Sequence, residues 1–333
     1  MSRRRLAVSG SLVASHLATP RGHFSDRRPA GGPDGGSGFA SSPPADAREV
    51  RWDGAAGNIC YGLGLLGLDP VLVGAAGADF EPYRLHLKSH GVDTDSVWVS
   101  DTRPTARLVR TSDRCRNRSA DFHSGAMAEA RHIDLGRVLA RTGRLTLMAV
   151  CSDDLAAMRR HTRACRRLGV PFAVGPCRQL DHLDRDQARQ LVDGARWLLT
   201  DEHESALLRE RTGWTEEAIL GRVDCWITTL GGAGARLRRE RAPAAEVPAV
   251  PVSGVVDRAG AGDAFRAGFL AGTVWGAPPE RAAQLGCTLA ATVLDYIGTQ
   301  EYRLYRDSLF ARMRDAYGPI ALARLLPFLG ALT

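Results

Sequence analysis

The feature that most constrains the fold is a regular alternation of short apolar runs and longer helical segments in the middle of the chain. The predicted strands are residues 145–150, 171–174, 196–200 and 225–229, and the predicted helices are 153–168, 184–193 and 203–212. Strands that alternate with helices of about ten residues favour an α/β fold with a parallel, doubly wound sheet. Ligands bind such sheets beyond the carboxyl ends of the strands, so we expect a site there.

The flanking regions continue this pattern on both sides. Strands are predicted at 6–8 and 71–75, helices at 57–67 and 80–90, short strands at 97–99, 107–110 and 120–122, and closing helices at 260–273, 279–297, 307–317 and 319–329. Residues 20–50 are rich in Gly, Pro and Ser, a composition that predicts a flexible loop.

Composition excludes several classes of protein. No apolar run approaches the roughly 18 residues that a membrane span needs, so we expect a cytoplasmic protein with no membrane partner. The net charge of +7 comes from arginines spread along the chain, and without a nucleic-acid-binding motif it predicts no nucleic-acid partner. Lys88 is the only lysine, which excludes a G-x-x-x-x-G-K-[ST] phosphate loop. The seven cysteines form no C-x-x-C pair, and an odd number argues against a disulfide framework.

Residues 257–270, DRAGAGDAFRAGFL, combine a glycine turn with the start of a helix. Gly260 and Gly262 form the turn, and apolar residues follow at helical spacing. Backbone N–H groups and the helix dipole favour an anion at such an N-terminus. Asp263 lies in the mouth of this anion site, where a carboxylate can remove a proton beside a bound phosphate. The pattern indicates a site for phosphate chemistry.

Several stretches, in this order, resemble one known family. DRAGAGDAFRAGFLAG is similar to the second signature of the ribokinase (phosphofructokinase-B) family of sugar and nucleoside kinases. The other matches are GNICYGLGLLGLDPVLVGAAGADF (57–80), SGAMAEAR (124–131), TTLGGAG (228–234) and GTQE (298–301). The resemblance covers nearly the whole chain and is strongest to adenosine kinases of the bacterial type. It implies one ribokinase-like domain over 1–333, a mostly parallel sheet flanked by helices, and a small β lid built from about 17–52 and 97–124.

The resemblance also implies roles for the glycine-rich turns. Asp263 is expected to take the proton of a primary hydroxyl that attacks the γ-phosphorus of ATP, while the N–H groups of Gly260, Ala261 and Gly262 hold the developing charge. Expected ATP contacts are Thr229, Gly231, Gly234, Asp201 and Arg258. Glu204 is expected to act on Mg²⁺ indirectly through water, although Asp201 stands where the family has asparagine. A monovalent cation such as K⁺ and a homodimer are features of relatives that the sequence leaves open.

The resemblance is weaker on the substrate side. Expected substrate contacts are Ser9, Ser15, Ser42, Gly54, Asn58, Phe122, Arg178 and Gln179. Ser15 stands where adenosine kinases carry an aspartate that binds both ribose hydroxyls, and Asp53 stands where a glycine is expected. Leu108 replaces a phenylalanine that would oppose Phe122 across the base. We therefore expect phosphorylation of the 5′ hydroxyl of adenosine, or of an adenosine-like nucleoside modified at the sugar or the base.

Two other functions stay open. A kinase of a free sugar or cyclitol would share Asp263 and both glycine loops but would need no aromatic base pocket. A non-catalytic nucleotide- or nucleoside-binding protein on the same scaffold is disfavoured, because the turn around Asp263 is intact.

Two further motifs have simpler interpretations. Gly62-x-Gly64-x-x-Gly67 matches a dinucleotide fingerprint but precedes a strand, the reverse of the required order, and so predicts close helix packing. His86 and His90 share a helical face without a third metal ligand, which predicts a solvated face.

Overall fold

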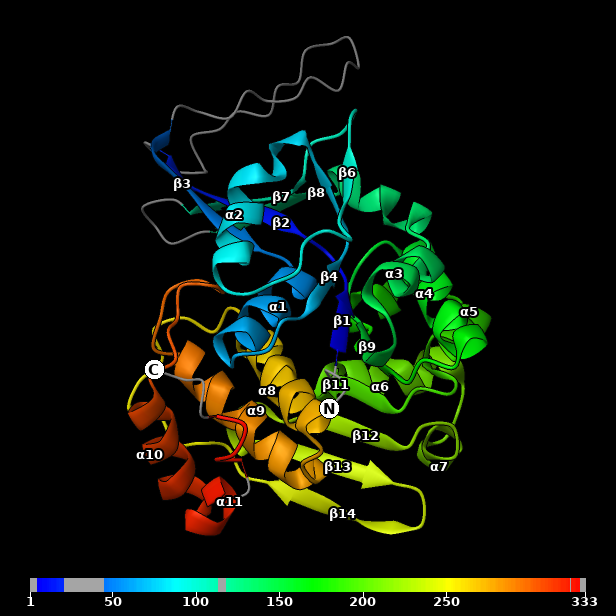
Figure 1. Cartoon of the computed structure of the whole chain (residues 1–333), viewed down its shortest axis with the longest axis vertical. Helices are drawn as coiled ribbons and strands as arrows, with labels where there is room; N and C mark the ends of the chain where they lie inside the picture. The colour runs from blue at the N-terminus through cyan, green and yellow to red at the C-terminus, as the bar shows by residue number, and fades with distance from the viewer. Residues whose placement is uncertain (1–4, 21–44, 113–117, 324, 330–333) are drawn as a thin grey trace, which may run out of the picture.

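The computed structural model describes residues 5–20, 45–112, 118–323 and 325–329, and in it a central sheet lies between two helical layers (Figure 1). The strand order is β14 (Ala242–Val247), β13 (Ala235–Arg239), β12 (Cys225–Thr229), β11 (Trp197–Asp201), β10 (Phe172–Val174), β9 (Leu145–Val150), β1 (Arg5–Ser9) and β4 (Val71–Val73). Strands β12 to β4 pair in parallel, and β13 and β14 are antiparallel. The predicted α/β, doubly wound, mostly parallel fold is confirmed.

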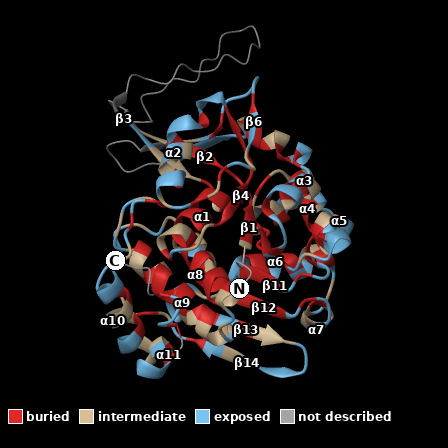
Figure 2. Cartoon of the chain, in the orientation of Figure 1, coloured by how far each residue is buried: buried red, intermediate tan, exposed pale blue. Residues whose placement is uncertain are grey.

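Alternate residues of each central strand point to opposite faces of the sheet, and both faces are buried (Figure 2). In β1, Leu6 and Val8 belong to one apolar cluster and Ala7 belongs to the other. The first cluster includes residues of α1 (Ala55–Leu65), α2 (Glu81–Ser89), α8 (Ala261–Trp275), α9 (Pro279–Val293), α10 (Arg306–Tyr317) and α11 (Pro319–Ala323). The second includes residues of α3 (Leu135–Thr142), α4 (Leu155–Leu168), α5 (Arg185–Val192), α6 (Glu202–Thr212) and α7 (Glu216–Leu220). None of the helices within the described ranges is long and apolar enough to cross a membrane.

A second sheet lies above the carboxyl ends of the central strands at the top of Figure 1, and we call it the lid sheet. Its order is β3 (Ala45–Asp53), β2 (Val13–Pro20), β7 (Ala106–Ser112) and β8 (Arg118–His123). The loop predicted over 20–50 is wrong for 45–50, because these residues pair with β2. The predicted strand at 97–99 becomes β6 (Trp98–Ser100), which pairs with β5 (Ala75–Gly77) in a separate sheet.

The glycine motif at the end of α1 and the histidine pair at the end of α2 both pack against neighbouring residues. A Cβ atom on Gly64 would lie 2.0 Å from the carbonyl oxygen of His90, which confirms the close packing predicted for the glycine motif. The solvated face predicted for the two histidines is wrong. His86 and His90 are half-buried, with ring centroids 5.4 Å and 4.7 Å from that of Tyr61, because the aromatic ring offers them an apolar surface.

Helix α8, which carries the glycine turn, is seated against α9 through two glycines. A Cβ atom on Gly268 would lie 2.8 Å from the Cα atom of Gly286, a distance that real Cβ contacts do not reach. We expect Gly268→Ala to lower the free energy of unfolding by about 1–3 kcal/mol, because the two helix backbones must separate. Chemical denaturation measures this change. Gly232→Ala is the control, since no atom in the described part of the chain lies within 4 Å of its Cβ position. Equal midpoints for both variants would contradict the packing.

Asp153, which follows β9, is buried, and few hydrogen bonds offset the cost of burying its carboxyl group. Its Oδ1 accepts a hydrogen bond from the Asp154 N–H at 2.9 Å, and its Oδ2 has no hydrogen-bond partner within the described part of the chain. Burial raises the pKa of Asp153 to about 8, against the smaller effect of that hydrogen bond.

The raised pKa of Asp153 predicts a loss of stability as the pH rises. Between its ordinary pKa of 3.8 and about 8, the folded state binds the proton that the unfolded state has released, so wild-type stability falls over this window. Asp153→Asn cannot ionise, so we expect its advantage over wild type to grow across this window, from a small difference at pH 4 to several kcal/mol at pH 8. Urea unfolding at both pH values tests this. The exposed control Asp224→Asn should show no such trend, and a pH-independent difference for Asp153→Asn would refute the assignment.

Candidate active site

The turn before α8 ends in a glycine N-cap, so the first N–H groups of the helix face outward instead of binding a capping side chain. Gly260 is left-handed (φ 79°) and is the N-cap of α8, and among the described residues no side chain caps the first turn. Asp257 fixes the approach, because its Oδ1 accepts from the Ala259 N–H at 3.0 Å and its Oδ2 from the Gly298 N–H at 3.1 Å. Against burial, which raises it, these hydrogen bonds hold the pKa of Asp257 below its usual value. The start of α8 therefore presents N–H groups that no side chain caps.

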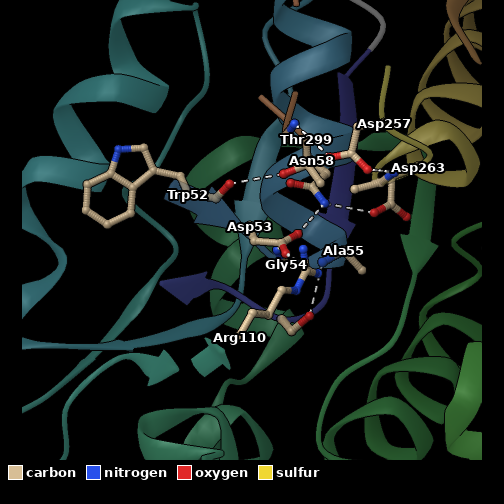
Figure 3. Close-up of polar contacts among 12 residues, drawn as sticks. Trp52, Asp53, Gly54, Ala55, Asn58, Arg110, Asp257, Asp263 and Thr299 are labelled. Atoms are coloured by element: carbon tan, nitrogen blue, oxygen red, sulfur yellow. Dashed lines mark hydrogen bonds and ion pairs between the residues drawn. The ribbon is translucent and has the colours of Figure 1, made fainter. Parts of the chain in front are cut away.

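Asp263 lies in the first turn of α8, and its carboxylate faces Asn58 in Figure 3. Its Oδ2 accepts from Asn58 Nδ2 at 2.9 Å, and its Oδ1 accepts from Arg266 Nη1 at 3.0 Å. The side chain is 17% exposed. Burial raises the pKa of Asp263, and Arg266 and Asn58 oppose that rise only in part. A carboxylate with a raised pKa that is still reachable is suited to act as a general base.

Arg266 connects Asp263 to the acidic residues at the start of α6. Its Nη2 lies 3.8 Å from Glu204 Oε2, and both side chains are largely buried. Glu204 and Asp201 form a capping box, in which the Asp201 N–H donates to Glu204 Oε2 at 2.9 Å and the Glu204 N–H donates to Asp201 Oδ1 at 2.7 Å. Burial raises the pKa of Glu204, opposed by Arg266. The sequence analysis predicted roles for Asp263 and Glu204 but missed Arg266, which lies between them.

Asn58 connects Asp263 to the lid side of the site. Its Nδ2 also donates to Asp53 Oδ1 at 2.9 Å, and its Oδ1 accepts from Gln300 Nε2 at 2.9 Å. Gln300 donates further to Tyr83 Oη at 2.6 Å. The GTQE motif, which the sequence marks without a role, therefore orients the asparagine that contacts Asp263.

The second glycine loop lies beside the first. A small cavity of about 10 Å³ is lined by residues of β11, β12 and α8, including Thr229 and Gly262. Gly231 (φ 54°) is open, since no atom of the described residues lies within 4 Å of its Cβ position. A Cβ atom on Gly234 (φ 102°) would lie 2.0 Å from the Val247 carbonyl oxygen, so only glycine fits there. Arg258 is exposed at the edge of the α8 turn.

The predicted substrate residues lie on several different elements of the fold. Ser15 and Phe122 lie on the lid sheet, where the Phe122 side chain is half exposed and pairs in register with Leu108. Ser9 is buried, and its Oγ is 2.7 Å from Nδ1 of His161, so its hydroxyl is engaged within the protein and does not join the Asp263 cluster.

The remaining described substrate positions include Gln179, in the segment after β10, and Gly54, directly before α1. Gln179 is half-buried on the 3-10 helix η4 (Cys177–His182), where only the backbone of Arg178 is described. Ser42 lies outside the described residues. Gly54 (φ 106°) must be glycine, because a Cβ atom there would lie 2.5 Å from the Ser11 carbonyl oxygen.

Comparisons with known proteins match this architecture. The family model described as "pfkB family carbohydrate kinase" matches residues 44–304. The chain is 24% identical over 251 residues to a nucleoside kinase of Methanocaldococcus jannaschii, which covers 75% of this chain and 81% of that protein.

Solved structures of a Burkholderia thailandensis nucleoside kinase have the same fold. The complex with inosine has a TM-score of 0.81 at 29% identity and covers 94% of this chain and 99% of the other. The complex with ADP-inosine has a TM-score of 0.78 at 30% identity, with 94% and 96% covered. Since the family model spans most of the sequence and includes the glycine turn, Asp263 and Asn58, the chain belongs to the pfkB family of carbohydrate kinases.

Proposed function

We propose that this protein is an ATP-dependent nucleoside kinase that phosphorylates the 5′ primary hydroxyl of adenosine or an adenosine-like nucleoside. The observation that carries the proposal is the place of Asp263, between Asn58 on the lid side and Arg266 on the side of Glu204, at the start of a helix without a side-chain cap. The Burkholderia relative with inosine and with ADP-inosine supports a nucleoside as acceptor.

In this proposal Asp263 acts as the general base. It takes the proton of the 5′ hydroxyl while that oxygen forms a bond to the γ-phosphorus, and the bond from the γ-phosphorus to the bridging oxygen breaks to release ADP. The N–H groups of Gly260, Ala261 and Gly262 hold the charge on the transferred oxygens, and one such donor lowers the barrier by about 3 kcal/mol. Asn58 and Arg266 keep the Asp263 carboxylate in place.

The acidic residues fit an indirect role toward magnesium. The described residues contain no group of three or more His, Cys, Asp or Glu that could enclose a metal ion. Mg²⁺ keeps several waters and binds largely through substrate phosphates, and it supplies charge neutralisation at those phosphates. Glu204 has one oxygen engaged by the Asp201 N–H, so it would hold the hydrated ion through water rather than directly.

The assay that tests this function measures ADP formation and nucleoside monophosphate with MgATP, with and without K⁺. The acceptors are adenosine, inosine, other nucleosides, ribose and a cyclitol. We expect adenosine or a related purine nucleoside to give the highest kcat/KM. Turnover of only ribose or the cyclitol would favour the sugar-kinase alternative, and binding without any turnover would favour the non-catalytic one.

A further inference from the structure

One face of the lid sheet gathers the side chains that approach Asp263. Cross-strand partners project to the same face, and so do residues two apart on one strand. In register, Val13 of β2 pairs with Asp53 of β3, and Ser15 pairs with Leu108 of β7. Leu108 pairs in turn with Phe122 of β8. Asp53, Ser15, Leu108, Arg110 and Phe122 therefore share one face, and Asp53 is linked to Asp263 through Asn58.

The Asp53 carboxylate is fixed from several directions. Its Oδ1 accepts from the Gly54 N–H at 2.8 Å and from Asn58 Nδ2 at 2.9 Å. The backbone carbonyl of Asp53 accepts from Tyr83 Oη at 3.0 Å. The Tyr83 ring stacks on the Trp52 ring, with the ring centroids 4.7 Å apart. The carboxylate thus has the defined orientation that recognition of a ligand group requires.

Asp53 and Asp263 share one donor. Asn58 Nδ2 gives a hydrogen bond of 2.9 Å to an oxygen of each, so these two oxygens lie no farther apart than twice that distance (Figure 3). In a ribose, the 5′ and 3′ oxygens are linked through only three carbon atoms. A sugar whose 5′ hydroxyl contacts Asp263 therefore brings its ring hydroxyls within reach of Asp53.

The second oxygen of Asp53 is the one available to a ligand. Its Oδ2 lies 3.6 Å from Arg110 Nη2, which is too long for a hydrogen bond but close enough to stabilise the charge. The side chains of Asp53 and Arg110 are 16% and 44% exposed. On the same face, Ser15 Oγ is buried and has no hydrogen-bond partner among the described residues. This hydroxyl could therefore also form a hydrogen bond with a bound ligand.

We propose that Asp53, supported by Arg110, is the residue that recognises the ring hydroxyls of the substrate sugar: Asp53 Oδ2 accepts a hydrogen bond from the 2′ or 3′ hydroxyl of the nucleoside. This inference rests on the proposed nucleoside kinase function. It assigns the recognition of the ring hydroxyls to the Asp53 carboxylate on β3 and not to Ser15 on β2. Asp53 stands at a position where the family resemblance predicts glycine. The proposal also predicts that a nucleoside whose ribose carries both the 2′ and the 3′ hydroxyl is a good substrate.

The test compares the ribonucleoside that wild type phosphorylates best with its 2′-deoxy and 3′-deoxy forms. A hydrogen bond to a charged group is worth about 1.5–3 kcal/mol, so we expect wild type to lose about 10- to 100-fold in kcat/KM with at least one deoxy form. Asp53→Asn keeps the shape and an acceptor for the Gly54 N–H. It should lower kcat/KM for the ribonucleoside about 10- to 100-fold, mainly through KM, and should reduce the deoxy penalty to about 3-fold or less.

Two further variants and a folding check complete the experiment. Arg110→Gln should reduce the same penalty in part. Glu49→Gln removes an exposed carboxylate from the same strand and should leave the penalty unchanged. Thermal unfolding confirms that each variant is folded.

The outcomes separate the two proposals. If wild type phosphorylates no nucleoside, the proposed function fails. If wild type phosphorylates ribose and deoxyribose forms equally, or Asp53→Asn keeps the full penalty, only this inference is overturned. An equal loss of kcat on every substrate would also overturn it, because Asp53 would then act only by positioning Asn58 and Asp263.

Discussion

Asp263→Asn is expected to lower kcat about 10³-fold while ATP binding is retained. The amide has the shape of the carboxylate but cannot accept the hydroxyl proton, and a positioned general base contributes about 10²- to 10⁴-fold. The variant should still fold, because Arg266 keeps Glu204 as an ionic partner and Asn58 still lies beside the new amide. Steady-state kinetics and titration with a non-hydrolysable ATP analogue measure the two quantities.

The control for this variant is Asp295→Asn, an aspartate at the end of the α9 region that pairs with Arg312 on the surface. It should keep wild-type kcat. If Asp263→Asn kept kcat within a few-fold of wild type, Asp263 would not be the base and the mechanism would need another proton acceptor.

Arg266→Met is expected to have the largest effect on stability. Arg266 lies between the buried carboxylates of Asp263 and Glu204, and removing one partner from a buried ionic cluster costs about 3–5 kcal/mol. Arg266 opposes the burial that raises the pKa of Asp263 and of Glu204, so both pKa values should rise further in the variant. A raised folded-state pKa of an acid weakens stability as the pH rises. The deficit should therefore be larger at pH 7.5 than at pH 5.

The same change should move the pH profile of the reaction. Because Asp263 must be ionised to accept a proton, the acid limb of kcat/KM should shift to higher pH in Arg266→Met. Arg312→Met is the matched control, since this surface pair contributes about 1 kcal/mol or less. Urea unfolding at the two pH values and a pH–rate profile supply the measurements. An unshifted acid limb with wild-type stability would rule out the coupling of Arg266 to Asp263.

The sequence predicted the central sheet well, because its strands are apolar on both faces and its helices begin with clear signals. It failed where local pattern is weak. Strand β3 has few apolar side chains and follows a stretch rich in Gly and Pro, so nothing local reveals its pairing with β2. The predicted helices 279–297 and 319–329 end earlier, at Val293 and Ala323. At the end of α9 the Leu294 carbonyl accepts from the Val256 N–H at 2.8 Å, a long-range contact that the local sequence pattern does not reveal.

The active site divides in the same way. The Gly260–Asp263 turn is a local motif and could be predicted. Arg266 follows Asp263 by three residues on one helix, a spacing that places both side chains on one face and could have been noticed. Gln300 could not be assigned, because its contact with Asn58 joins residues far apart in the chain. The sequence marked Asp53 only as a departure from an expected glycine. Its proposed role depends on the pairing of β3 with β2, which places it on the same face as Ser15.

The most direct test of the central claim follows the phosphoryl group itself. With ATP labelled in the γ-phosphate, wild-type protein and the best nucleoside should yield a labelled nucleoside 5′-monophosphate in an amount equal to the ADP formed, and Asp263→Asn should yield almost none. Label released as free phosphate, attached to another hydroxyl, or transferred equally well by Asp263→Asn would contradict the account.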